Sequence, residues 1–485
     1  MPRVIFLLFL LAVLVRFLYF PNNVNFAYDQ ARDSFAALDI LKGDFKIIGP
    51  PTTAGGEIFH GALVYYILAP IYFFSGNNPE IAAAIFRVIN ALGVFSVFYI
   101  GYLIFNTQVG ILSSLLFAIS FEQTQYSLFF GHPAPGVFTI LIFYLGLALL
   151  IFKNESKGFV IALLGLGLSI QFEDANIPLI LVFLIFTIIF NKKIKLLNIK
   201  FLFLGGVVLA LTLSTFILSE IKYNFRMSYA LLEIVSKSTN ETLNIQNIFR
   251  LVPSVLVVFF IIVFFGMIRK KDLRTKGLFL STWFLGGMIP QILNPNFTYY
   301  YSPGATVSLL ILASFLIHQL FLKKKILASS IIGVIIFSNL SLVISQNNKG
   351  PNSDIVIQPG MLTVNQRQAL DYIYEKASGQ PFAVNALTVP LNIKTTWDYI
   401  FNWYGKEKYG YVPIWGGEAA DGFHGRLEVI TDRSKLPNRR FTVVEPTVGI
   451  GEGNVDDFFR IENYFSKVVE EKTFGTIKVQ ERERI

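Results

Sequence analysis

Residues 28–33 (Tyr-Asp-Gln-Ala-Arg-Asp) place three charged side chains between two strongly apolar segments. After Asp29, residues Ala31, Phe35, Leu38 and Leu41 recur at helical spacing, which predicts an amphipathic helix lying on the membrane. On this helix Asp29 and Asp33 share one face because they are four residues apart, and Arg32 lies beside them. Carboxylates at such an edge either cap and solvate a helix at the membrane surface or act on a substrate there. Several long outer loops at one membrane face favour the second interpretation, because a membrane surface alone does not require them.

Further candidate residues lie in the polar segments between apolar runs. Glu173 and Asp174 form a second acidic pair, which either binds an acceptor or a divalent ion or occupies a solvated turn. Lys222 and Arg226 open an amphipathic segment and suit either a lipid phosphate or anionic lipid in general. Tyr300 either stacks on a sugar ring or prenyl chain, or lies in an interfacial aromatic belt.

The chain has four histidines and no cysteine, and the histidines lack the paired spacing of a metal site. The sequence therefore does not support a divalent metal cofactor. His60, in the first outer loop, is a candidate substrate contact. His132, in a Gly-His-Pro-Ala-Pro segment, either exchanges a proton or is structural. Arg87 lies near the start of a long apolar run, where a charge is costly unless it is used or reaches the surface.

Composition predicts a polytopic membrane protein. The 485 residues are 53% hydrophobic and 15% charged, and the mean hydropathy is +0.56. The net charge of +9 comes from residues 1–345, where Lys and Arg outnumber Asp and Glu by 24 to 14, against 17 to 18 in residues 346–485. The positive excess therefore sets orientation in the membrane and does not indicate a nucleic-acid partner.

Apolar runs of about 17–25 residues, long enough to cross a bilayer, predict about eleven transmembrane helices. They cover roughly residues 4–20, 80–105, 108–122, 135–152, 158–172, 176–190, 201–219, 248–268, 277–293, 300–321 and 326–345. Residues 57–76 form a further apolar segment, which we interpret as interfacial or re-entrant, because another span would disrupt the alternation of loop charge.

Loop charge predicts the orientation. Lys and Arg concentrate in alternate loops, at residues 153–157, 192–200, 269–276 and 323–325. By the positive-inside rule these loops and the N-terminus are cytoplasmic. The first outer loop, about residues 21–79, the acidic pair and the whole tail then lie outside, most simply at the plasma membrane.

Residues 346–485 predict a separate soluble α/β domain outside the membrane. Residues 364–377 and 455–465 show helical patterns, and residues 381–389 and 440–444 are typical of buried strands. We expect the tail to have a core of its own.

The first outer loop resembles a known family. The segments at 28–33, Leu41-Lys-Gly-Asp44, Gly49-Pro-Pro, Phe59-His-Gly61 and Ala69-Pro70 resemble those of membrane glycosyltransferases with the GT-C fold. Within that fold, the segments resemble most those of glycosyltransferase family 39 and its bacterial relatives, which include protein O-mannosyltransferases and the lipid A aminoarabinose transferase. The likeness extends over most of residues 1–320. It implies a transmembrane catalytic module over residues 1–345 and transfer of a sugar from a polyprenyl-phosphate donor to an acceptor on the outer face.

The resemblance implies that Asp29 is the catalytic carboxylate. Such a group takes the proton of an acceptor hydroxyl as that oxygen attacks the anomeric carbon, and Arg32, Arg87, Lys222 and Arg226 are candidates to bind the donor phosphate. Two positions depart from the family pattern. Gln30 stands where an acidic residue often follows the catalytic Asp, and His132 stands in the loop that often holds a second Asp.

Three functions are compatible with these features. The leading hypothesis is a hexosyl- or pentosyltransferase using a lipid-phosphate-linked sugar, with a protein, lipid or glycan as the acceptor. The alternative is a transporter or flippase of lipid-linked or small polar substrates, and the third is a noncatalytic anchor. Transporters place ionisable groups near the middle of broken helices. Here these groups gather at the outer face, which favours surface chemistry.

Overall fold

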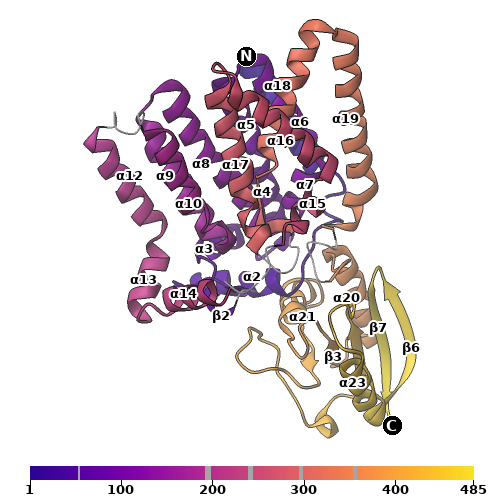
Figure 1. Cartoon of the computed structure of the whole chain (residues 1–485). Coiled ribbons are helices and arrows are strands. Elements are labelled where there is room, and N and C mark those ends of the chain that lie inside the picture. The colour runs from indigo at the N-terminus through magenta and orange to yellow at the C-terminus, as the bar shows by residue number, and fades with distance from the viewer. Residues whose placement is uncertain (53–54, 192–197, 239–243, 294–298, 353–357) are drawn as a thin grey trace.

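The computed structural model describes residues 1–52, 55–191, 198–238, 244–293, 299–352 and 358–485. Figure 1 shows a bundle of helices and, beyond one end of the bundle, a smaller part that contains a sheet. The helical bundle belongs to the first 346 residues, and the five-stranded sheet belongs to the tail. Of the predicted cytoplasmic lysines, Lys192, Lys193 and Lys195 lie outside the described residues.

The elements that carry the first outer loop come at the start of the chain. A short hairpin separates two helices of this loop, and the first long apolar helix pair follows. The bounds are α1 (Pro2–Arg16), α2 (Tyr28–Ile40), β1 (Pro51–Thr52), β2 (Gly55–Phe59), α3 (Leu63–Ser75), α4 (Pro79–Ala91) and α5 (Gly93–Ile104).

The rest of the bundle consists of the helices that follow α5 in the chain. They are α6 (Thr107–Ile119), α7 (Phe121–Leu128), α8 (Pro133–Lys153), α9 (Lys157–Phe172), η1 (Asp174–Asn176), α10 (Leu179–Ile189), α12 (Ile199–Thr212), α13 (Ser214–Lys222), α14 (Arg226–Ser238), α15 (Gln246–Leu251), α16 (Ser254–Arg269), α17 (Arg274–Leu293), η2 (Tyr299–Tyr301), α18 (Val307–Lys323) and α19 (Lys325–Gln346).

Each of the predicted apolar runs contains helix in the described residues, so the helical class is confirmed. By length and composition, three stretches within the described parts of the chain suffice to cross a membrane: Pro79–Ile104, Pro133–Lys153 and Lys325–Lys349. The pair α12 and α13, bent by 62°, makes a fourth if it is one span. Several other apolar helices, α3 among them, have 10–17 residues. The number of spans therefore stays a prediction.

Helix α2 is amphipathic as predicted, but protein rather than lipid covers its apolar face. Phe35 is buried, and its ring packs edge-on against Tyr399 with the ring centroids 5.3 Å apart. The guanidinium of Arg426 lies 5.5 Å from the same ring. Helix α3 and the tail helix α21 (Thr395–Ile400) both contact α2. The expectation that α2 lies on the membrane is therefore corrected.

The tail contains a mixed five-stranded sheet in the order β4-β3-β5-β7-β6. Strand β3 runs parallel to β4 and β5, while β7 is antiparallel to both β5 and β6. The bounds are α20 (Thr363–Ala377), β3 (Ala383–Leu387), α22 (Lys406–Tyr409), β4 (Ile414–Trp415), β5 (Arg439–Val444), α23 (Glu452–Phe465), β6 (Ser466–Phe474) and β7 (Ile477–Arg484). The two helices and the two buried strands expected from the pattern are present.

The tail shares its apolar core with the first outer loop. One buried cluster contains side chains of α2, α3 and α4 together with side chains of the tail, such as Trp397 and Trp415. Main-chain hydrogen bonds join the two parts, from the Phe26 N–H to the Met361 carbonyl at 2.8 Å and from the Thr363 N–H to the Val24 carbonyl at 2.9 Å. The outer loop is therefore held by the tail as well as by the bundle.

Candidate active site

Asp29 lies at the exposed start of α2 and pairs with Arg32. Its carboxylate is 57% exposed, and its Oδ1 atom lies 2.7 Å from Arg32 Nη1. The helix start is secured by Gln30 instead, whose side chain accepts from the Ala27 N–H at 3.1 Å and donates to the Phe130 carbonyl at 3.0 Å. Asp29 is therefore not needed as a cap, and its carboxylate is open to an incoming group.

Arg32 joins the two carboxylates of α2. Its Nε donates to Asp33 Oδ1 at 2.9 Å while its Nη1 donates to Asp29, so the guanidinium bridges two turns of one helix face. Asp33 is buried, with its carboxylate 5% exposed. Burial by itself raises the pKa of Asp33, but Arg32 and then His132 outweigh burial and hold this pKa below its usual value. Asp33 is therefore a fixed negative charge.

His132 connects α2 to the loop before α8. Its Nε2 lies 3.3 Å from Asp33 Oδ2, close enough for an ion pair, although the angle does not make a well-aligned hydrogen bond. The position of the ring follows from its local sequence. Gly131 adopts a positive φ of 147°, and Pro133 begins α8, where its missing N–H costs nothing.

His60 brings a third outer segment to this place. Its ring stacks on that of His132 with the ring centroids 4.7 Å apart. The His60 carbonyl accepts from the Gly49 N–H at 3.1 Å, and the next residue, Gly61, donates to the Gln171 carbonyl at 3.1 Å. These bonds fix the end of the first outer loop against the end of α9.

The acidic pair completes the cluster. His60 Nδ1 lies 3.2 Å from Asp174 Oδ1 and 3.7 Å from Glu173 Oε1. Glu173 is 1% exposed, so the solvated turn considered from the sequence is not what the structure shows. Burial raises the pKa of both carboxyls, and for Glu173 the nearby Asp174 raises it further. Burial, and then His132, lower the pKa of His60.

Two tyrosines face the same cluster. Burial raises the pKa of Tyr300, and after Tyr301 the negative charges of Glu173 and Asp29 add to the effect. Burial also raises the pKa of Tyr65, to which Asp33 contributes. Tyr65 was not among the predicted site residues, although its place shortly after His60 was the available signal.

The structure does not bring Arg87, Lys222 or Arg226 to this cluster by any contact among the described residues. The buried Arg87 donates to the Arg16 carbonyl and to Asn23 Oδ1, both at 3.0 Å. Lys222 lies over the ring of Tyr223, and Arg226 pairs with Glu57 of β2. Arg226 thus remains near the first outer loop, whereas Arg87 serves the packing of α1 against α4.

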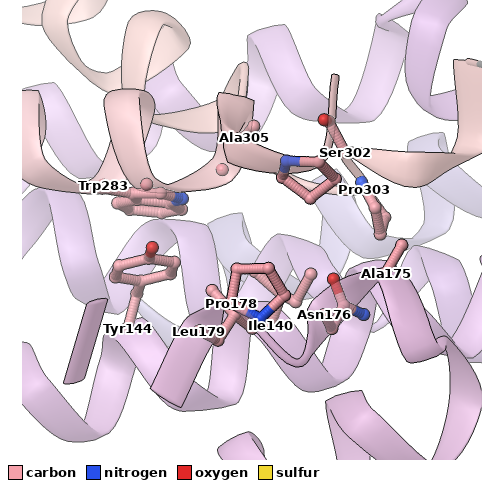
Figure 2. A pocket seen from close by; sticks show the side chains of 13 residues that line it. Ile140, Tyr144, Ala175, Asn176, Pro178, Leu179, Trp283, Ser302, Pro303 and Ala305 are labelled. Carbon is pink, nitrogen blue, oxygen red and sulfur yellow. The ribbon is translucent and has the colours of Figure 1, made fainter. Parts of the chain in front are cut away.

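A small cavity lies between the bundle helices, and Asn176 of its wall follows the acidic pair closely in the sequence. Figure 2 shows its wall, in which the rings of Tyr144 and Trp283 stack with centroids 4.1 Å apart. Asn176 and Ser302 supply its few polar groups. The space has room for about one water molecule, so this cavity is no substrate site in the present conformation.

Comparison with solved structures defines the fold. The chain is similar to ArnT from Cupriavidus metallidurans, with a TM-score of 0.62, 10% identity, and coverage of 98% of this chain and 97% of that one. The same protein bound to undecaprenyl phosphate gives a TM-score of 0.61 at 11% identity, with the same coverage. The oligosaccharyltransferase of Archaeoglobus fulgidus gives 0.54 at 13% identity, covering 85% of this chain and 64% of that one. The chain has the GT-C fold, as the sequence predicted.

The family comparison points to the same class. Residues 60–218 match the model of the dolichyl-phosphate-mannose-protein mannosyltransferases. The predicted resemblance to the glycosyltransferase family 39 group is confirmed over this stretch. No curated protein sequence matches the chain.

Proposed function

We propose that the chain is an integral membrane glycosyltransferase that moves a sugar from a polyprenyl-phosphate donor to an acceptor hydroxyl at the outer membrane face. The observation that carries the proposal is the convergence of separate outer segments on one polar cluster. Residues of α2, the end of the first outer loop, the loop before α8 and the turn after α9 contact one another there. A mere membrane anchor has no use for so many buried ionisable groups in one place.

Asp29 acts as the general base. Its exposed carboxylate takes the acceptor proton while the acceptor oxygen forms a bond to the anomeric carbon. The bond from that carbon to the phosphate oxygen breaks, and the electron pair leaves with the prenyl phosphate. Arg32 holds Asp29 in place through the 2.7 Å contact and supplies positive charge close to the departing phosphate. Because Asp29 is exposed, its proton then passes to water.

His132 and Asp33 form the buried support of this site. Asp33 Oδ1 pairs with Arg32 Nε and fixes the guanidinium, and Asp33 Oδ2 lies 3.3 Å from His132 Nε2. His132 is the residue positioned to exchange a proton with a bound sugar hydroxyl. Lys222 and Arg226 lie at the two sides of the α13–α14 turn, where they suit the lipid phosphate on its way to the site.

The assigned donor class is supported by a similar structure, and the proposed membrane placement is supported by loop charge. One structure of the similar ArnT was solved with undecaprenyl phosphate, so a prenyl phosphate is the donor class that we assign here. The outer-face location of the site rests on the loop-charge rule, which places all contributing segments on one side. Both remain parts of the proposal.

Transfer is tested with purified full-length protein and a panel of radiolabelled prenyl-phosphate sugars, following loss of donor. Asp29→Asn is expected to reduce transfer by at least about a hundredfold, the usual scale of a lost general base. Asp44→Asn is the matched control, because Asp44 is an exposed carboxylate of the same loop, paired with Lys46. Equal rates for Asp29→Asn and wild type would refute the assignment of the base.

The transporter alternative makes a different forecast. The bent pair α12 and α13 is the kind of broken helix that transporters use, but the polar cluster is built from loop ends and α2. Vesicles containing the protein should therefore not accumulate lipid-linked sugar when acceptor is absent. Accumulation that survives Asp29→Asn would favour the transporter.

A further inference from the structure

His60, Glu173 and Asp174 place three potential metal ligands around one point. One atom from each side chain, the His60 Nδ1 and a carboxylate oxygen of each acid, lie within 4.8 Å of one another. His60 reaches this point from the first outer loop, while the two acids come from the turn that follows α9. The stack on His132 covers one face of the His60 ring, so that Nδ1, at the ring edge, meets the carboxylates.

A second observation concerns Glu173 alone. Its Oε1 atom is buried and has no hydrogen-bond partner among the described residues, yet this is the atom that lies 3.7 Å from His60 Nδ1. Among the described residues, neither Glu173 nor Asp174 forms an ion pair with lysine or arginine, and the basic side chain that pairs with both is His60. Burying a carboxylate without such a cationic partner costs folding free energy unless a proton or a cation neutralises the charge.

The distances fit a tetrahedral ion. Zinc bonds to histidine nitrogen and carboxylate oxygen are about 2.0–2.2 Å long, which puts neighbouring tetrahedral ligands about 3.4 Å apart. The two separations from His60 Nδ1, 3.2 Å and 3.7 Å, lie on either side of that value. The Asp174 N–H donates to Nδ1 at 3.4 Å, and a bound ion would replace this long contact at the one lone pair of Nδ1.

We propose that His60, Glu173 and Asp174 bind one divalent transition-metal ion, with zinc as the best match. One imidazole and two carboxylates leave a fourth position open, as in sites that accept an outside ligand. Asp29 is not a ligand, since its contact is to Arg32. If the proposed function holds, the open position offers a cation to a phosphate or sugar oxygen.

The site is tested by metal content, without donor or acceptor. The full-length protein in detergent is stripped with a chelator, incubated with ZnCl2, desalted, and analysed for zinc per chain by mass spectrometry. We expect about one zinc per chain in the wild type and at least a tenfold loss in Glu173→Gln, which keeps the size of the side chain.

Asp39→Asn is the matched control, because Asp39 Oδ2 lies 3.7 Å from His424 Nδ1 in a histidine–carboxylate pair without a second acid. It should keep the wild-type zinc content. If Glu173→Gln elutes as aggregate, Asp174→Asn replaces it. A wild type that holds no zinc, or variants that hold as much as the wild type, would overturn the metal site and show that a proton neutralises the pair. The proposed transfer by Asp29 would be unaffected by that result, and its own failure would leave the zinc content unchanged.

Discussion

The imidazoles of His60 and His132 stack with their ring centroids 4.7 Å apart, although 71 residues of chain lie between them. The stack joins the end of the first outer loop to the start of α8. It also separates two carboxylate environments, with Asp33 on the side of His132 and Asp174 on the side of His60.

His132→Phe keeps the aromatic stack and removes both ring nitrogens. Transfer is expected to fall by at least tenfold, since Asp33 loses one of its two partners and the proposed proton exchange is lost. The melting temperature should change by no more than a few degrees. Unchanged transfer would mean that His132 contributes packing alone. Donor loss, measured together with thermal unfolding in detergent, separates the two roles.

Arg32→Lys tests whether one guanidinium must bridge two carboxylates. A lysine ammonium cannot reproduce a fork that contacts Asp29 and Asp33 at 2.7 Å and 2.9 Å. We expect kcat to fall by at least tenfold, while the protein still purifies as a single species. Arg439→Lys is the control, because Arg439 is a partly exposed side chain that pairs with Glu481 across strands β5 and β7 of the tail sheet. Wild-type kcat in Arg32→Lys would show that charge alone suffices.

Arg87→Leu tests a residue that the sequence offered as a phosphate contact. Its guanidinium donates to the Arg16 carbonyl and to Asn23 Oδ1. Removing a buried donor leaves these acceptors unpaired, at a cost of about 1–3 kcal/mol each. We expect a lower unfolding temperature and an unchanged KM for the donor in the folded fraction. A raised KM at wild-type stability would restore the phosphate role.

The raised pKa of Glu445 leads us to expect that the stability of the fold depends on pH. Burial raises the pKa of Glu445 to about 7, against the opposing effect of hydrogen bonds from Gln358, the Val389 N–H and Trp397. A raised folded-state pKa means that the stabilising contribution is complete below about pH 4.5 and is lost as the pH rises through 7. The difference corresponds to at most about 3 kcal/mol.

Thermal unfolding between pH 5 and 8 measures this effect. The melting temperature of the wild type should fall over that range, and Glu445→Gln should flatten the profile. Asp457→Asn, which alters an exposed carboxylate, should retain the wild-type slope. Parallel profiles for wild type and Glu445→Gln would contradict the prediction.

The sequence predicted the helical class and the secondary structure of α2 because apolar spacing and loop charge are local properties. The repeat of Ala31, Phe35 and Leu38 is enough to predict a helix. It cannot identify the partner of that face, since Tyr399 lies far along the chain. The same limit applies to Arg87, because its role depends on which carbonyl groups its guanidinium contacts after folding.

The acidic pair illustrates a second limit. His60 and Glu173 are far apart in sequence, so no local spacing could reveal that His60 Nδ1 and Glu173 Oε1 are 3.7 Å apart. The hairpin of β6 and β7 was missed for a different reason. The middle of β6 is exposed and charged on both sides, as in Glu470 and Glu471, and gives no alternation of apolar and polar residues.

The shared core of α2 and the tail constrains how the protein can be re-engineered. Exchanging the tail for that of a distant relative would remove the contacts of Tyr399 and Arg426 with the Phe35 ring. These contacts support the helix that carries Asp29. The tail therefore cannot be transplanted as a module. A functional chimera would need the tail and residues 21–79 to be inherited together.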